Sequence, residues 1–285
     1  MTAKLRLVSW LDHHTRFLGR HPVGVRLRHT LRGLAGRAGS FGVIADGLAI
    51  EGDIGDRDYL RYLAGGGYET LTVRMFRDAI RRGMAVADIG AHIGYFTLIA
   101  ARLVGSEGRV WAFEPNPDSL RFLRHNVERN SLGDRTVISA VAASNVGGSA
   151  QFHLEPGNRM ASSLFVGHDF GCAIPVDTGR LDDLIPGVVD VMKMDVEGGE
   201  IRALQGMPRI LSQLQILLIE LNPPFLRASG CRPDEVLELL ETAGLQAQVV
   251  DESRHQLRPL EASDVAGDHV VNLYASRCES QHGSG

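Results

Sequence analysis

The chain is poor in cysteine and lysine and has no long apolar run. Its three cysteines, Cys172, Cys231 and Cys278, lie far apart among 285 residues. This odd, scattered set excludes a disulfide framework and a paired-cysteine zinc site, so we expect reduced thiols in a cytoplasmic protein. No segment approaches the ~18 apolar residues of a membrane-spanning helix. The N-terminus lacks the apolar stretch and cleavage site of a signal peptide. We therefore expect no transmembrane segment.

Charge is distributed unevenly. Residues 1–37 carry eight basic side chains and one acidic side chain, a net charge of +7, whereas the whole chain carries −4. We interpret this arm as an amphipathic helix that packs on the core; the alternatives are binding of an anionic partner or a membrane surface, and homo-oligomer formation. The remaining residues carry −11. Because such a surface repels phosphates, we expect no nucleic-acid partner.

Short apolar segments alternate with amphipathic ones from residue 84 onward, which implies βαβ units and an α/β fold. We predict a Rossmann-like sheet of seven mainly parallel strands with helices on both faces. The predicted strands are residues 84–89, 109–113, 136–142, 188–194, 216–221, 246–250 and 269–275. The predicted helices are residues 69–82, 95–104, 117–130, 200–211 and 233–243.

Three other parts of the chain complete this organisation. An insert at residues 143–187 is expected to add strands. Residues 1–67 are predicted to be a basic arm followed by a glycine-rich connector of loops and short strands. We divide the chain into this N-terminal part, a catalytic domain at residues 68–276 and a flexible tail at residues 277–285.

A glycine-containing turn follows the first predicted strand. Residues 88–94 are Asp-Ile-Gly-Ala-His-Ile-Gly, so Gly90 permits a sharp turn and Gly94 a close approach of the next helix. The following strand ends in Glu114, 24 residues after Gly90. An acid there can accept both ribose hydroxyls of an adenosine group. Because the turn lacks the third glycine of the pyrophosphate-binding pattern, it favours S-adenosylmethionine over a dinucleotide.

The fourth predicted strand leads into a cluster of charges. Strand alternation puts Lys193, Asp195 and Glu197 on one side of the chain, and Lys193 is one of only two lysines. Buried charges are costly unless they pair or bind a ligand, so we favour a catalytic cluster over a salt-bridged strand end. A lysine beside carboxylates can act as a base or orient an acceptor oxygen. His92 is another candidate base, with a structural hydrogen bond as the alternative.

Glu220 and Asn222 end the neighbouring predicted strand and extend this cluster. Asp195, Glu197 and Glu220 have the oxygen ligands that a hard cation prefers, whereas no histidine is positioned to complete a zinc site. The metal therefore stays unassigned, and a divalent cation is compatible with the residues but not favoured.

Together these residues resemble the FkbM-type methyltransferases, a branch of the class I S-adenosylmethionine-dependent enzymes. The resemblance spans about residues 68–250, and its most specific segment is Lys-Met-Asp-Val-Glu-Gly-Gly-Glu at 193–200. It also rests on Tyr68-Glu69 and on residues 86–97, 112–116, 126–130, 161–164 and 219–221. The family usually has asparagine at the position of His92, and alanine or histidine is commoner at Gly199.

The resemblance implies a class I methyltransferase sheet and methyl transfer to a hydroxyl of a sugar or secondary metabolite, in natural-product biosynthesis. From the charge cluster itself we expect Asp195 to face the acceptor, with Lys193 and Glu197 either handling the proton or positioning the acceptor. The cofactor roles fall on Asp88, Gly90, Gly94, Glu114 and Asn116, and further contacts are expected at Glu69, Ala91, Pro115 and Ala142. The alternatives are an NAD-dependent oxidoreductase, a non-catalytic cofactor-binding scaffold and an RNA methyltransferase.

Overall fold

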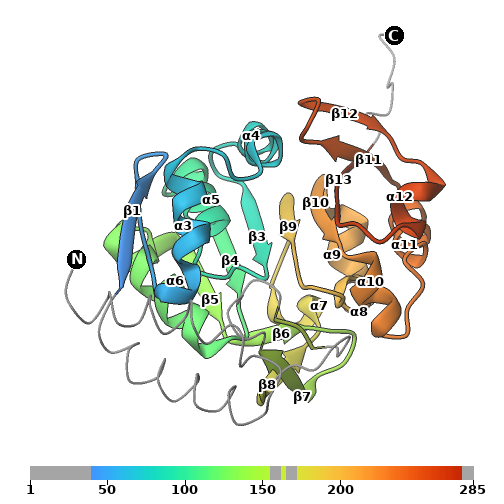
Figure 1. The fold of residues 1–285 in the computed structure, drawn as a ribbon, viewed down its shortest axis with the longest axis horizontal. Coiled ribbons are helices and arrows are strands. Elements are labelled where there is room, and N and C mark those ends of the chain that lie inside the picture. Colours follow the sequence, from blue (N-terminus) through green and yellow to red (C-terminus); the bar gives the residue numbers. More distant parts are fainter. Residues whose placement is uncertain (1–39, 155–161, 165–171, 278–285) are drawn as a thin grey trace, which may run out of the picture.

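An eight-stranded sheet forms the centre of the molecule (Figure 1). The computed structural model describes residues 40–154, 162–164 and 172–277. The strands of this sheet are β3 (Ala85–Ile89), β4 (Arg109–Phe113), β5 (Thr136–Ser139), β9 (Val191–Met194), β10 (Ile216–Leu221), β11 (Leu245–Asp251), β12 (Gln256–Pro259) and β13 (Val271–Arg277). They lie in the order β12-β11-β13-β10-β9-β3-β4-β5.

The sheet is parallel from β5 to β10 and antiparallel beyond it. The neighbouring pairs among β5, β4, β3, β9 and β10 run parallel, whereas β13, β11 and β12 each pair antiparallel with their neighbours. The predicted α/β fold, with a mainly parallel Rossmann-like sheet, is confirmed. The eighth strand, β12, was not predicted; it forms a hairpin with β11 at the sheet edge.

Helices cover both faces of the sheet, as the apolar runs of the strands require. One face packs on α4 (Thr70–Ala79), α5 (Tyr95–Val104) and α6 (Pro117–Arg129), with Val86, Val110 and Leu218 in the same apolar cluster. The other face packs on α8 (Glu200–Gln205), α9 (Pro208–Gln213), α10 (Pro223–Ala228) and α11 (Glu235–Thr242). Figure 1 shows α5 and α6 on one side and α8 to α11 on the other.

Two predicted elements are divided in the structure. The helix predicted at 200–211 is two helices, α8 and α9, because Pro208 lacks an N–H and would clash with the preceding turn inside a helix. The strand predicted at 136–142 is β5 in the central sheet followed by β6 (Val141–Ala143) in a second sheet. The chain therefore changes sheets at Ala140, next to the carboxyl ends of the parallel strands.

The insert adds strands, as expected, and they join β6 in this second sheet. Its strands are β6, β7 (Gly148–Leu154) and β8 (Cys172–Gly179), in the order β6-β8-β7. The short helix α7 (Leu181–Leu184) returns the chain to the core. A second short helix, α12 (Ala262–Ala266), precedes β13. No helix in the described ranges is long and apolar enough to cross a membrane.

The connector before the predicted catalytic domain is more ordered than its glycine content suggests. It contains the hairpin β1 (Phe41–Ala45) and β2 (Leu48–Gly52), the short 3-10 helix η2 (Ile54–Asp56) and the helix α3 (Arg57–Ala64). The strands agree with the prediction, whereas the helix α3 was not predicted. Burial of Leu60 and Leu63 in the same apolar cluster as α4 and α5 stabilises this helix. The basic arm and the last residues lie outside the described ranges, so the division into three parts stays a prediction.

Candidate active site

The turn after β3 passes close to the backbone that follows β9. Gly90 has a φ of 83°, a left-handed conformation that glycine adopts without strain. A Cβ at this position would lie 1.8 Å from the backbone oxygen of Asp195. Only glycine therefore allows the turn to pass beside the end of β9. Gly94 precedes α5 with a φ of 100°, and a Cβ there would lie 2.6 Å from Leu123 Cδ1.

Glu114 is fixed at the end of β4 by two backbone donors. Its Oε2 accepts the His92 N–H at 2.7 Å, and its Oε1 accepts the Asn116 N–H at 2.7 Å. The side chain is buried, and burial raises the pKa of this carboxyl. Each carboxylate oxygen keeps a further lone pair, so Glu114 can still accept two hydroxyls of a ligand ribose.

Strand register aligns the charged residues in two rows on the face covered by α4 and α5. Asp88 pairs with Lys193, and Lys193 pairs with Leu218. Paired residues on neighbouring strands point to the same side, so Asp195 and Glu220, each two residues further along, form the next row. Asp88 accepts the Thr97 hydroxyl at 2.5 Å, and burial raises its pKa to about 6.

Lys193 is a buried cation among carboxylates. Its side chain is 2% exposed, and its Nζ lies 3.6 Å from Asp195 Oδ2 and 5.3 Å from the centre of the Phe96 ring. Burial by itself lowers the pKa of Lys193, but Asp195, Glu69 and further carboxylates outweigh it and raise that pKa above its usual value. The Nζ has no hydrogen-bond partner among the described residues. A ligand oxygen would satisfy this charged donor.

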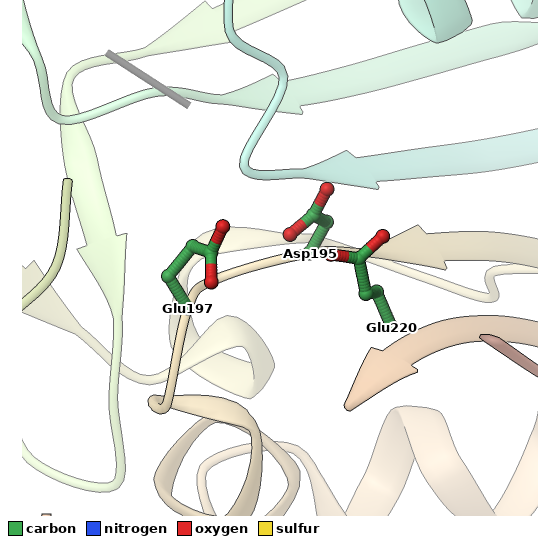
Figure 2. A group of neighbouring side chains, drawn as sticks. All are labelled: Asp195, Glu197 and Glu220. Atoms are coloured by element: carbon green, nitrogen blue, oxygen red, sulfur yellow. The ribbon is translucent and has the colours of Figure 1, made fainter. Parts of the chain in front are cut away.

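Asp195, Glu197 and Glu220 converge at the ends of β9 and β10. Each offers a carboxylate oxygen within 4.8 Å of the others, and Figure 2 shows the three carboxylates facing a common space. Glu197 has a φ of 49° and accepts the Asn222 amide at 2.9 Å. Burial, reinforced by the charge of Asp195, raises the pKa of Glu197 to about 8. Burial also raises the pKa of Glu220 well above its usual range.

The last glutamate of the segment 193–200 has a structural role. Glu200 is 1% exposed at the start of α8 and accepts the Gly198 N–H at 3.0 Å. Gly198 has a φ of 93°, and a Cβ there would lie 2.9 Å from Phe225 Cβ. Glu200 and Gly198 thus hold the turn that presents Glu197.

Several of these groups line one pocket, whose wall comes from the turn after β3, the ends of β4 and β9, α3 and the second sheet. The predicted site residues in its wall are Asp88, Gly90, Ala91, Glu114, Pro115, Ala142, Lys193, Asp195 and Glu197. The other three lie outside that wall. Gly94 and Asn116 shape the turns beneath it, and Glu69 begins α4 with a φ of 39°.

Sequence reasoning missed several residues of the wall. Tyr59 comes from α3 in the connector, and Phe152 and Ser162 come from the insert. No pattern around Tyr59 or Phe152 indicated a site, because both are brought in by packing between distant segments. Ser162 lies within the segment 161–164 that carries the family resemblance, which was the one available signal.

The oxygen-rich cluster has the donor set of a hard cation, but Lys193 alters its charge. The Lys193 ammonium lies 3.6 Å from Asp195, where it already supplies positive charge and would repel a divalent ion. The geometry therefore suits a hydroxyl ligand better than a metal, and we do not favour a divalent cation.

A model of the methyltransferase FkbM domain matches residues 88–246, more than half of the chain. The chain belongs to the FkbM methyltransferase family. Hexuronic acid methyltransferase AglP of Haloferax volcanii is 28% identical over 189 residues, which are 65% of this chain and 72% of that protein. A protein-L-isoaspartate O-methyltransferase of Triticum aestivum is 34% identical over 85 residues, 30% of this chain and 33% of that protein.

Among solved structures, the methyltransferase FkbM from Methylobacillus flagellatus KT aligns with a TM-score of 0.45 and 17% identity. The alignment covers 78% of this chain and 55% of that chain.

Membership of the family decides against the oxidoreductase and the non-catalytic scaffold. The protein is an S-adenosylmethionine-dependent methyltransferase, and the predicted cofactor is confirmed. The close approach at Gly90 and the ribose-accepting geometry of Glu114 fit this cofactor.

Proposed function

We propose that this FkbM-family methyltransferase methylates a hydroxyl of a small polar molecule, a sugar or a secondary metabolite. The observation that carries the proposal is the position of Asp195 and Glu197, which line the same pocket as Gly90 and Glu114. Carboxylates and the neighbouring Asn222 amide are the groups that bind hydroxyls. The name of the Haloferax volcanii relative, a hexuronic acid methyltransferase, supports a sugar-like acceptor. We place the reaction in natural-product biosynthesis.

The residues of the pocket divide the chemical work. Bound S-adenosylmethionine supplies a methyl group that its sulfonium activates for displacement. Glu114 accepts the ribose hydroxyls, and Asp195 faces the acceptor. The Lys193 ammonium donates to the acceptor oxygen and orients it. Glu197 takes the hydroxyl proton as the carbon–oxygen bond forms, for which its pKa of about 8 suits a base near neutral pH.

Transfer of a labelled methyl group to a panel of neutral sugars, hexuronic acids and other polyols tests this proposal. We expect Asp195→Asn to lower turnover by roughly 100-fold or more, because the acceptor loses a charged partner. S-adenosylhomocysteine affinity should be retained. The matched control is Asp183→Asn, an exposed acid in α7, which should leave turnover unchanged.

Two results would contradict the proposal. Full turnover of the Asp195→Asn variant would remove Asp195 from the acceptor site. Release of the label by mild alkali would identify a methyl ester, because methyl ethers resist alkali. The acceptor would then be a carboxylate rather than a hydroxyl.

A further inference from the structure

We infer that Asp56 is a positioning residue of the cofactor site, which acts through His92 on the peptide that holds Glu114. The inference concerns cofactor binding and stands independently of the acceptor. Asp56 lies outside residues 88–246, which match the family model. The connector would then complete the cofactor site rather than only join the arm to the catalytic domain.

His92 links the ribose-binding acid to the N-terminal unit formed by β1, β2, η2 and α3. Its backbone N–H donates to Glu114 Oε2 at 2.7 Å. Its ring Nε2 lies 3.2 Å from Asp56 Oδ1. His92 has a φ of 51°, in the narrow left-handed region where an L-residue has little freedom. A change in the position of the ring therefore turns the peptide that holds Glu114.

Asp56 is itself held rigidly. Its side chain is 1% exposed, and its Oδ2 accepts the Asp53 N–H at 2.9 Å. A Cβ on Gly52 would lie 2.7 Å from Oδ2, so the glycine allows the strand to pass beside this carboxylate. These contacts fix one oxygen and leave Oδ1 against the histidine.

A second set of contacts joins the same two regions. The Tyr59 ring packs edge-on against the His92 ring at 5.3 Å and against Tyr68 at 4.9 Å. On the other side of the turn, Asn126 accepts the Glu51 N–H at 2.8 Å and donates to the Ile93 carbonyl at 2.8 Å. The N-terminal unit thus contacts the turn after β3 directly at His92, and Asn126 of α6 links it to the next residue, Ile93.

This arrangement strengthens cofactor binding because it keeps Glu114 oriented before the cofactor arrives. The ribose needs Glu114 already oriented, and a binding group held in place by its neighbours loses less freedom when the ligand arrives. Without the Asp56 contact the His92 ring can adopt more conformations. The His92 peptide, whose N–H donates to Glu114, then becomes more mobile as well. Binding must then order that peptide, which weakens the affinity for the cofactor.

Calorimetric binding of S-adenosylhomocysteine to the full chain tests the inference. We expect Asp56→Asn and His92→Asn each to weaken binding roughly 5- to 30-fold, the size of a modest coupling between two sites. The double variant should lose the same factor, not the product, because both changes remove one contact. The control is Asp58→Asn, whose side chain is 80% exposed and lies 3.6 Å from Arg61; it should bind like the parent.

Kinetics separate positioning from general damage. In both single variants the KM for S-adenosylmethionine should rise, while kcat at saturating cofactor is retained. His92→Asn keeps the N-terminal unit intact and carries a residue that tolerates a positive φ, so it remains informative if Asp56→Asn does not fold. Unchanged affinity in His92→Asn, losses that multiply in the double variant, or an equal loss in Asp58→Asn would each overturn the inference.

Discussion

Glu197 combines the features of a base that is matched to neutral pH. It is half-buried at the end of β9, accepts the Asn222 amide at 2.9 Å and faces Asp195 and Glu220. Burial and the charge of Asp195 hold its pKa at about 8. Lys193 compensates part of this negative charge from within the sheet. At neutral pH most molecules of the cofactor-free protein therefore carry a protonated Glu197, which becomes a carboxylate as the pH rises through about 8.

We expect kcat/KM to increase as the pH rises through about 8, because a base must be ionised to accept the proton. The apparent pKa in kcat should be lower, since the sulfonium cation of the bound cofactor stabilises the carboxylate. Glu197→Gln should remove this rise and lower turnover by roughly 100-fold. An unchanged pH profile in the variant would exclude Glu197 as the base.

The same carboxyl affects stability with a defined sign. Its pKa rises from 4.5 to about 8 on folding, so between these values the folded chain binds more protons than the unfolded chain. Stability of the cofactor-free protein therefore falls as the pH rises across this window. Chemical denaturation at several pH values measures this dependence. The free energy of unfolding should change less with pH in Glu197→Gln than in the parent.

At the scale of elements, the start of α4 depends on a residue from the far end of the chain. Glu69 precedes the helix in a left-handed conformation and makes no side-chain cap. Glu252, in the turn after β11, instead accepts the Leu71 N–H at 2.9 Å and the Thr72 N–H at 2.8 Å. A carboxylate there also complements the positive end of the helix. The edge hairpin β11–β12 thereby fixes the start of a helix that packs on the central sheet.

We predict that Glu252→Ala lowers the free energy of unfolding by about 1–2 kcal/mol, the cost of losing a charged helix cap. Thermal or urea denaturation measures this change. Glu107→Ala, an exposed glutamate in a turn, is the control and should change stability little. Equal stability of the Glu252→Ala variant and the parent would show that the cap contributes nothing measurable.

At the scale of the whole molecule, the N-terminal unit shares its core with the catalytic sheet. Ile50 and Leu60 are 0% and 1% exposed and belong to the same apolar cluster as Phe76 and Ile93. Each such side chain contributes about 1.5–3 kcal/mol of burial, whereas whole domains are stable by only about 5–15 kcal/mol. Loss of this unit therefore removes a large fraction of the total stability.

We predict that a chain beginning at residue 68 melts far below one beginning at residue 40, or does not fold, and that its affinity for S-adenosylhomocysteine is lost. Differential scanning calorimetry and ligand binding on both chains measure this difference. Equal melting temperatures would mean that the domain begins at residue 68, as the sequence pattern predicted.

Local signals predicted the scaffold and the family well. The apolar runs of β3, β4 and β10 and the helical spacing of α5 are short-range patterns, and their predicted bounds agree with the structure within a residue. The turn at 88–94 predicted the cofactor and the segment 193–200 predicted the family, because both sites need particular residues at fixed spacing. The break at Pro208 was also readable from sequence, although it was missed.

The sequence by itself determined the α/β fold, the methyl donor and the family, because these depend on periodicity and on motifs whose residues are close in the chain. Only the tertiary structure brought Tyr59 and Asp56 to the site and Glu252 to the start of α4, since their partners lie in distant segments. It also decided which polar groups stay available to a ligand: Glu114 is held by two backbone N–H groups, and the Lys193 ammonium lacks a hydrogen-bond partner among the described residues. Such contacts arise from packing and strand register, which no local pattern records.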